Sequence, residues 1–319
     1  MLVKMFRYLK AEGEDPMKIV VAGGTGFIGR SLVERLVDSG HTALVLTRNR
    51  TKIRTLYSPT VPVADWDGRS SGDWARHLEG ADAVINLAGE PIAAKRWTSV
   101  QKERIVGSRI ESTSAIVGAI KKSTKKPQVL INASGVGYYG DVKVGGVTEV
   151  SPNGDDFFAR LCHQWESAAR EAEHHGVRVV ALRTGIVLHK SGGVLRRFLL
   201  PFNLFVGGPL GPGTQWLSWI HREDAMRAIL FALENRSLSG AVNIAAPEPA
   251  TMSEFCAELG KAMGRPSWFS VPEFALRLVL GEMVDVVIKG QRAIPKKLLD
   301  AGFVFRFPTL SEALSDLMK

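Results

Sequence analysis

Three glycines, Gly23, Gly26 and Gly29, stand three residues apart and could cradle a phosphate group. They follow residues 18–22, a β-branched apolar run typical of a buried strand, and they open residues 27–37, whose apolar positions have helical spacing. Gly23 allows a tight turn, Gly26 lets the backbone approach a pyrophosphate, and Gly29 lets the helix pack closely against the strand. Free N–H groups at the helix start would bind the phosphates. The pattern predicts a dinucleotide site, the alternative being a glycine turn that only joins strand to helix.

The residues after the next predicted strand, 42–46, indicate which dinucleotide binds. An NAD site has an Asp or Glu about 20 residues beyond the glycines, where it holds the ribose 2′-hydroxyl. Here Thr47 or Arg48 takes that place, and Arg50 is close in sequence. A carboxylate would repel a 2′-phosphate, whereas a guanidinium can bind it through two hydrogen bonds. We therefore expect NADP(H) rather than NAD(H), with the alternative that these charges form only a solvated loop.

Strands and helices alternate along the chain, which predicts an α/β fold with a doubly wound parallel sheet covered on both faces. Further strands are expected at residues 61–65, 81–89, 128–134, 177–182 and 241–245, and the clearest helices at residues 100–121 and 157–175. Beyond about residue 185, apart from residues 223–247, which return to the sheet, we expect loops and helices without clear strands. The predicted division is an N-terminal extension at 1–16, a dinucleotide-binding domain at 17–186 plus 223–247, and a smaller, mostly helical substrate-side domain at 187–222 plus 248–319.

The composition of the chain limits its partners. The 319 residues carry a net charge of +9, but apart from residues 121–126 the basic residues are dispersed, so a nucleic-acid partner is not expected. The positive charge would instead attract phosphorylated small molecules. The length fits one large domain and a smaller one.

Other features favour a cytoplasmic protein. The two cysteines, Cys162 and Cys256, cannot make a disulfide framework, which indicates a reducing compartment. Residues 1–16 lack the features of a secretory signal. The most apolar stretch, residues 274–288, is interrupted by charged residues. We interpret it as an amphipathic core helix rather than a membrane span.

Motifs along the chain resemble those of the extended short-chain dehydrogenase/reductase superfamily, and most closely its epimerase-like branch with a C-terminal domain of unknown function. The resemblance covers nearly the whole chain from residue 17 and rests on the motifs at residues 23–29, 86–90, 96–97, 134–140, 182–185, 207–211, 219–221 and 295–299. It implies a Rossmann fold, a nicotinamide cofactor, and hydride transfer by an oxidoreductase or by an isomerase of the epimerase type.

The chain departs from this superfamily at the residues that move the proton. Its members use a Tyr-x-x-x-Lys pair on a helix for that purpose, and a Ser that orients the substrate oxygen. The aligned helix has Phe158 and Cys162 in place of Tyr and Lys. Ser134 matches the catalytic Ser, and Tyr138 or Tyr139 could offer a substitute phenol, although the interpretation of both as aromatic pocket walls with hydroxyls bonded to backbone is favoured. Cys162 is better explained as a small buried hydrophobe than as a nucleophile.

The predicted site has three groups of residues. The predicted catalytic residues are Ser134, Tyr138 and Tyr139. The predicted cofactor-binding residues are Gly23, Thr25, Gly26, Phe27, Ile28, Gly29, Thr47, Arg48, Asp65, Leu87, Ala88, Gly89 and Arg109. Around the substrate we expect Glu90, Arg96, Trp97, Arg183, Trp216 and His221. No metal is expected, because the seven histidines do not recur at ligand spacing.

Two functions fit these residues. The first is an NADP(H)-dependent oxidoreductase or epimerase-like enzyme that acts on a small molecule, with neither nucleic acid nor a membrane as partner. The second is a non-catalytic NADP(H)-binding sensor or regulatory protein, suggested by Phe158 and Cys162. Transfer of label from deuterated NADPH to an acceptor would distinguish them.

Overall fold

Seven short apolar runs form one parallel sheet in the computed structural model, which describes residues 15–93 and 95–319. The strand order is β10-β6-β5-β4-β1-β2-β3, and every neighbouring pair runs parallel. The strands are β1 (Lys18–Ala22), β2 (Thr42–Thr47), β3 (Val63–Asp65), β4 (Ala83–Asn86), β5 (Val129–Gly135), β6 (Arg178–Thr184) and β10 (Gly240–Ile244). The predicted α/β class and doubly wound sheet are confirmed. The predicted extension at residues 1–16 lies almost wholly outside the described residues.

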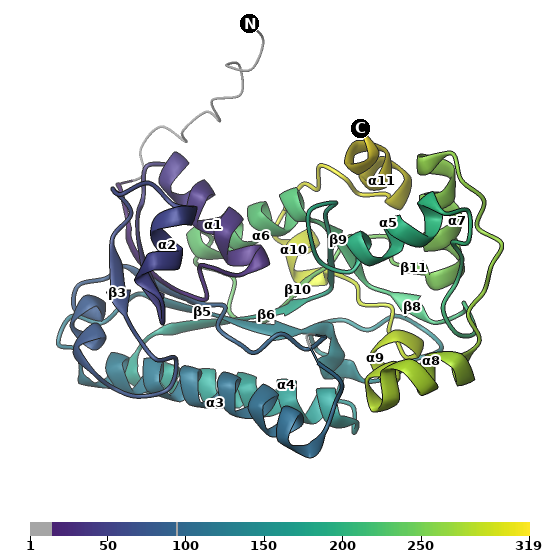
Figure 1. The fold of residues 1–319 in the computed structure, drawn as a ribbon. Coiled ribbons are helices and arrows are strands. Elements are labelled where there is room, and N and C mark those ends of the chain that lie inside the picture. Colours follow the sequence, from purple (N-terminus) through teal and green to yellow (C-terminus); the bar gives the residue numbers. More distant parts are fainter. Residues whose placement is uncertain (1–14, 94) are drawn as a thin grey trace, which may run out of the picture.

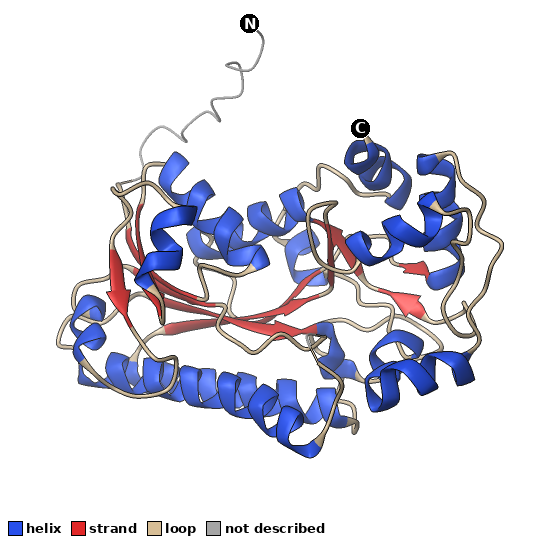
Figure 2. Ribbon diagram, in the orientation of Figure 1, coloured by secondary structure: helices blue, strands red, loops and turns tan. Residues whose placement is uncertain are grey.

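Helices cover both faces of this sheet (Figures 1 and 2). One face carries α3 (Ser99–Lys122) and α4 (Phe157–Arg170), and the other carries α1 (Phe27–Asp38) and α6 (Arg222–Glu234), with α2 (Arg50–Leu56) beside α1. Successive strand residues point to opposite faces, so Ile19 and Val21 join the core under α1 and α6, whereas Val20 and Ala22 join the core under α3. This double burial explains why the strands are continuous apolar runs.

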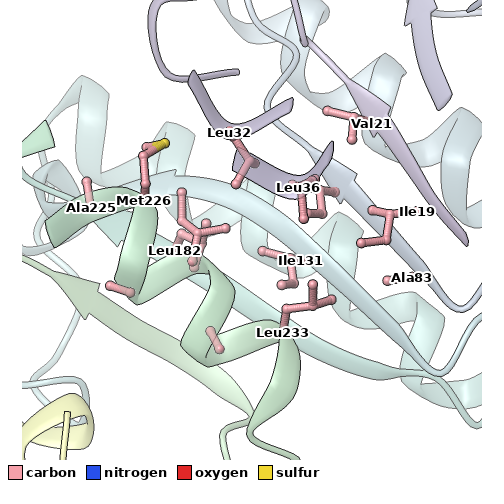
Figure 3. Close-up of a cluster of buried hydrophobic side chains, with 14 of the residues drawn as sticks. Ile19, Val21, Leu32, Leu36, Ala83, Ile131, Leu182, Ala225, Met226 and Leu233 are labelled. Carbon is pink, nitrogen blue, oxygen red and sulfur yellow. The ribbon is translucent and has the colours of Figure 1, made fainter. Parts of the chain in front are cut away.

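The core under α1 and α6 holds the helix that follows the glycines in place (Figure 3). Leu32 and Leu36 of α1 pack in one cluster with Ile131 of β5 and Leu233 of α6, and all four are almost fully buried. The start of α1 is thereby fixed over the carboxyl end of β1. Because β1 has β4 on one side and β2 on the other, that end lies where the strand order reverses, which is the usual ligand position in such sheets.

The chain after β6, apart from α6 and β10, builds a second layer beside the sheet. It contains β7 (Ile186–Leu188) paired with β9 (Trp219–His221), and β8 (Trp216–Leu217) paired with β11 (Ala250–Thr251). The expectation of no strands here is wrong, because pairs of two or three residues are too short to show a period of two. The helices α5 (Leu195–Asn203), α7 (Met252–Met263) and α11 (Leu310–Met318) pack around a separate core.

The expectation of a core helix over residues 274–288 is also wrong. The segment is divided into α8 (Glu273–Leu280), the 3-10 turn η4 (Gly281–Val284) and α9 (Asp285–Ile288). Gly281 has φ +60°, which ends α8. Only Leu276 of α8 is buried, and Phe274, Leu278 and Val279, which were expected in the core, are exposed.

The remaining elements are η1 (Asp73–Leu78), η2 (Val136–Tyr139), η3 (Glu171–His175), which extends the end of α4, and α10 (Lys296–Asp300). No helix within residues 15–93 or 95–319 combines the length and the apolar character that a bilayer span requires.

Candidate functional site

The glycine turn between β1 and α1 has no room for a side chain at Gly23 or Gly29. Gly23 has φ +78°, and a Cβ added to it would lie 2.5 Å from the carbonyl carbon of Leu87. A Cβ on Gly29 would lie 2.3 Å from the Gly23 carbonyl oxygen, so helix and strand approach as closely as predicted. Gly26 is the N-cap of α1 and offers no side chain that could bond the first amides of the helix. These amides therefore remain available for a phosphate.

The other residues of the turn lie between the sheet and the second layer. Thr25, Phe27 and Ile28 are half-buried. The Phe27 ring lies 6.4 Å from the His189 ring, and a Cβ on Gly192 would lie 2.7 Å from it. The segment after β7 thus covers the first turn of α1.

The charged residues beyond the glycines gather at the ends of β2 and β3. Thr47 pairs in register with Asp65, and its hydroxyl accepts a hydrogen bond from the Asn49 amide at 3.0 Å. Asp65 forms an exposed ion pair with Arg50, with 2.8 Å between Oδ2 and Nε. Arg48 is exposed and forms no ion pair with any described residue. Of the two arginines, Arg48 is therefore the one free to bind a phosphate.

The segment after β4 is held by a buried amide. Asn86 is fully buried and donates to the side chain of Asn132 at 2.7 Å, while its own oxygen accepts from the Ala88 amide at 3.2 Å. This fixes the course of Leu87, Ala88 and Gly89 directly beside the glycine turn.

Two predicted residues, Glu90 and Arg109, adjoin this segment. Arg109 reaches from α3 to Gly89, where a Cβ would lie 3.1 Å from the guanidinium carbon. The backbone amide of Glu90 donates to Ser108 at 2.9 Å.

Ser134, at the end of β5, belongs to a buried polar network. Its hydroxyl donates to Oε1 of Glu166 at 2.8 Å. Glu166 is 1% exposed and is bound by two nitrogens of Arg183 at 2.8 and 2.9 Å. Arg183 was expected to anchor the substrate, but its guanidinium is already engaged here and is buried as well. The network holds Ser134 in one orientation, with its only hydrogen directed at Glu166.

Tyr139 is a second member of this network. Its hydroxyl donates to Asn243 at 2.7 Å and accepts from Arg183 at 3.0 Å, so its partners are side chains rather than backbone. Burial raises the pKa of Tyr139 to about 12, although Arg183 opposes the shift. A phenol so held is poorly suited to proton transfer near neutral pH.

Tyr138 differs from Tyr139 in its surroundings. Its ring is half-buried and stacks on Arg183, whose Cζ lies 3.4 Å from the ring centroid. No hydrogen bond to its hydroxyl is found among the described residues. Tyr138 is thus the less constrained of the two phenols.

Comparison with known proteins identifies the family. Residues 19–245 match the family model described as NAD dependent epimerase/dehydratase family, and residues 271–317 match a Domain of unknown function (DUF1731). The chain belongs to the NAD dependent epimerase/dehydratase family. The resemblance to the epimerase-like branch of the extended short-chain dehydrogenases/reductases is thereby confirmed.

Similar members of this family cover nearly the whole chain. It is 41% identical over 314 residues to the Epimerase family protein SDR39U1 homolog, chloroplastic, of Arabidopsis thaliana. That alignment covers 97% of this chain and 89% of that protein. It is 40% identical to the Epimerase family protein YfhF of Bacillus subtilis, over 95% of this chain and 98% of that protein. A crystal structure of human epimerase family protein SDR39U1 with NADPH has a TM-score of 0.84 and 35% identity, and the alignment covers 95% of this chain and 99% of that chain.

In this chain, the residues that stand in place of Tyr and Lys are Phe158 and Cys162, and both pack against other side chains. The Phe158 ring contacts Trp97, with 5.1 Å between ring centroids, and Trp97 is itself buried. Cys162 is 4% exposed, and burial raises the pKa of its thiol to about 11. The thiol is therefore neutral near pH 7, which agrees with its interpretation as a buried small side chain.

The other residues expected around the substrate lie apart from the Ser134 network. Arg96 is exposed and packs on Gly281. The Trp216 indole donates to the backbone of Lys143 at 3.3 Å. His221 caps α6 by accepting from the Glu223 amide. None of these side chains forms a hydrogen bond with the network.

The sequence reasoning gave no role to three polar residues that complete the site: Asn86, Glu149 and Asn243. Asn243 joins the network through Tyr139, and the carboxylate of Glu149 accepts from the Asn243 amide at 3.1 Å. Their partners are about 50 to 100 positions away in sequence, so no local spacing could have shown them. Within the described residues, no three His, Cys, Asp or Glu side chains gather to hold a metal.

Proposed function

We propose that this protein binds NADP(H) at the carboxyl edge of the sheet and uses it to oxidise or reduce a small molecule. The proposal is carried by one observation: the turn from Gly23 to Gly29 has no space for a Cβ at Gly23 or Gly29 and presents the uncapped start of α1. A pyrophosphate fits such a turn. Arg48, exposed and without an ion pair among the described residues, would bind the 2′-phosphate. The similar human protein crystallised with NADPH supports the same assignment.

The cofactor, when bound, supplies hydride transfer. The chain's own part would fall on Ser134 and Tyr138. Because Ser134 gives its hydrogen to Glu166, it can only accept a hydrogen bond from the substrate. It would therefore orient a hydroxyl or N–H group, and Tyr138 would move the proton. This is an oxidoreductase or epimerase-like activity on a small substrate that offers such a donor.

A second function is favoured by a specific observation. Phe158 has no ionisable group, Cys162 is a buried neutral thiol and the Tyr139 hydroxyl is bonded within the protein, so none of the three is suited to move a proton. A protein that binds NADP(H) without turnover, as a sensor or regulator, would have this arrangement.

Hydride transfer distinguishes the two functions. Purified protein would be mixed with stereospecifically deuterated NADPH and a panel of aldehydes and ketones that also carry a hydroxyl or N–H group, and each recovered compound examined for deuterium. Transfer of label that is lost in Ser134→Ala and reduced in Tyr138→Phe supports the enzyme. Tight binding of NADPH with no transfer across the panel supports the sensor. Absence of NADPH binding, measured by calorimetry, would contradict both.

We further propose a cytoplasmic protein whose partner is this small molecule, with no nucleic-acid or membrane partner. The location is supported by the two cysteines, Cys162 and Cys256, which are both free and buried, as in proteins of a reducing compartment.

A further inference from the structure

Exposed apolar side chains gather on the outer edge of the second layer. We call the following nine the apolar patch: Leu200, Leu204, Phe205, Val206, Trp268, Phe269, Phe274, Leu278 and Val279. The patch contains every exposed Phe and Trp side chain of the described residues, whereas the large apolar side chains exposed elsewhere are mostly valines. Single apolar residues are normal on a protein surface, but a group with four aromatic rings indicates an interaction site.

Backbone contacts join the parts of this patch into one surface. The Trp268 indole donates to the carbonyl oxygen of Phe205 at 2.8 Å, and the Phe269 amide donates to Gly207 at 3.2 Å. The chain after α5 and the chain before α8 therefore run side by side. In Figure 1 the segment between α7 and α8 follows the right edge of the molecule down to α8. On α8, Phe274 and Leu278 are one helical turn apart and lie on the face opposite the buried Leu276.

Phe205 stands where a helix end favours glycine. The Val206 amide donates to the carbonyl of Pro201 and the Phe205 amide to that of Phe202, both at 3.0 Å, which is the usual bonding of a helix end whose next residue is left-handed. Phe205 has φ +61° and is the one non-glycine residue of the described chain with a positive φ. Arg265 lies over its ring, yet Phe205 remains exposed. A large ring at a position that disfavours any side chain indicates a contact that one chain alone does not supply.

The area of the apolar patch fits an interface between two proteins. An aromatic side chain can bury about 150–250 Å², so the four aromatic residues, which are 52–76% exposed, leave roughly 400–650 Å² uncovered. The five aliphatic side chains add roughly 200–400 Å². A stable interface of standard size buries about 800 Å² on each partner, and the largest apolar patch of a typical monomer is about 300–600 Å². The patch is therefore large enough to hold a dimer together.

We propose that two copies of this chain form a two-fold dimer through the apolar patch. In such a dimer the same surface lies on both sides of the contact, so an apolar patch of this size meets a partner of equal size and character. The charged side chains of α8 do not oppose the contact, because Glu273 and Arg277 pair with each other, with 2.7 Å between Oε1 and Nη2. Since α8 lies within residues 271–317, the proposal gives the Domain of unknown function (DUF1731) a role in assembly.

Sedimentation velocity of the full chain tests this proposal. At concentrations up to about 50 μM, above the dissociation constants usual for interfaces of this size, the parent should sediment at twice the chain mass of 34.8 kDa. Leu278→Glu places a carboxylate in the contact and should weaken dimerisation at least about 100-fold. Val304→Glu is the matched control and should remain dimeric, because Val304 is 72% exposed, against 78% for Leu278, and lies outside the apolar patch.

A second variant separates the interface from the stability of the single chain. Phe205→Gly removes the ring and places the favoured residue at the end of α5. We expect dimerisation to weaken at least about tenfold. In the monomeric Leu278→Glu background, Phe205→Gly should not lower the midpoint of urea unfolding.

Each other result overturns the proposal. If the parent is monomeric, a second copy does not cover the apolar patch, which then belongs to a different protein or to a membrane. If the parent is dimeric and Leu278→Glu and Phe205→Gly associate as tightly as the parent, or if Val304→Glu dissociates as readily as Leu278→Glu, the dimer forms through another surface. Circular dichroism checks that each variant is folded, and Leu204→Glu, in the other half of the patch, replaces Leu278→Glu if that variant does not fold.

Discussion

At the scale of single residues, the site offers few groups that could move a proton near neutral pH. Phe158 has no proton to give, and burial raises the pKa of Cys162 to about 11 and the pKa of Tyr139 to about 12. Tyr138 is then the phenol left to move a proton. Chemistry at this site would depend on orientation and electrostatics more than on an ionised side chain.

Arg48 is the residue whose charge should select the phosphorylated cofactor. Arg48→Asp should weaken NADPH binding by about 1–3 kcal/mol, since a charge-assisted contact is lost and a repulsive carboxylate is added. Calorimetry with NADPH and NADH measures the effect, and NADH affinity should not fall. Arg54→Asp, an equal charge change farther along α2, is the control. Equal NADPH affinity in Arg48→Asp and the parent would contradict the role given to Arg48.

Tyr139 should make the protein less stable at alkaline pH. Its pKa is raised by burial from 10.0 to about 12, so between these values the unfolded chain loses the proton while the folded protein keeps it. The stabilisation is complete below pH 10 and is lost as the pH rises toward 12, by about 2–3 kcal/mol for this group. Urea unfolding from pH 9 to 11.5 tests this. In Tyr139→Phe the free energy of unfolding should fall less steeply with pH, and an unchanged slope would show that Tyr139 does not cause it.

The sequence allowed the local part of the site to be predicted and not the long-range part. Gly23, Gly26 and Gly29 act together within seven residues, and their spacing alone predicts the turn. The Ser134 network instead joins Glu166 and Arg183 from α4 and β6. A buried carboxylate and a buried guanidinium are visible as a pair only when the two elements pack against each other.

At the scale of elements, the contact between α1 and β1 decides whether the phosphate site exists. A Cβ on Gly29 would lie 2.3 Å from the Gly23 carbonyl oxygen, so Gly29→Ala must push the helix away from the strand. We expect a destabilisation of about 1–3 kcal/mol, as for other overpacked positions, and a loss of NADPH affinity of at least about tenfold. Urea unfolding and calorimetry measure the two effects.

A second glycine that lies within a helix, Gly118, gives the control for that experiment. Gly118 lies within α3, and a Cβ added there would meet no atom within 4 Å. Gly118→Ala should leave NADPH binding unchanged and should stabilise the helix by up to about 1 kcal/mol. If Gly29→Ala bound NADPH as tightly as Gly118→Ala, close packing at Gly29 would not matter for the site.

How accurately the sequence predicted a helix or strand depended on the length of that element and on its burial. The first strand was predicted with its observed bounds, Lys18–Ala22, because a strand buried on both faces is apolar throughout. The strands β7, β8, β9 and β11 were missed because each has three residues or fewer. The segment 274–288 was misjudged because its apolar residues were assumed to be buried, whereas burial depends on what packs against them, and most of α8 faces solvent.

At the scale of the whole molecule, the sheet and the second layer are joined through α6. Asp224, in the first turn of α6, is fully buried, and its carboxylate accepts from the backbone amides of Arg306 and Phe307, both at 2.8 Å. These residues lead into α11, which packs against α7 in the second core. In Figure 1, α11 and the yellow segment before it lie beside α6 at the top of the molecule. The Asp224 carboxylate therefore links the C-terminal part of the chain to α6, a helix that covers the main sheet.

Asp224→Ala should accordingly loosen the second layer. It leaves two backbone N–H groups, one on the buried Phe307, without an acceptor, and we expect it to cost about 2–4 kcal/mol. Asp316→Ala is the control: that carboxylate is 41% exposed and 3.5 Å from His221, whose pKa burial lowers, so its loss should cost less than about 1 kcal/mol. Urea unfolding followed by tryptophan fluorescence measures both. Equal stability of the two variants would mean that the second layer is held by its apolar core, and not by the anchoring carboxylate on α6.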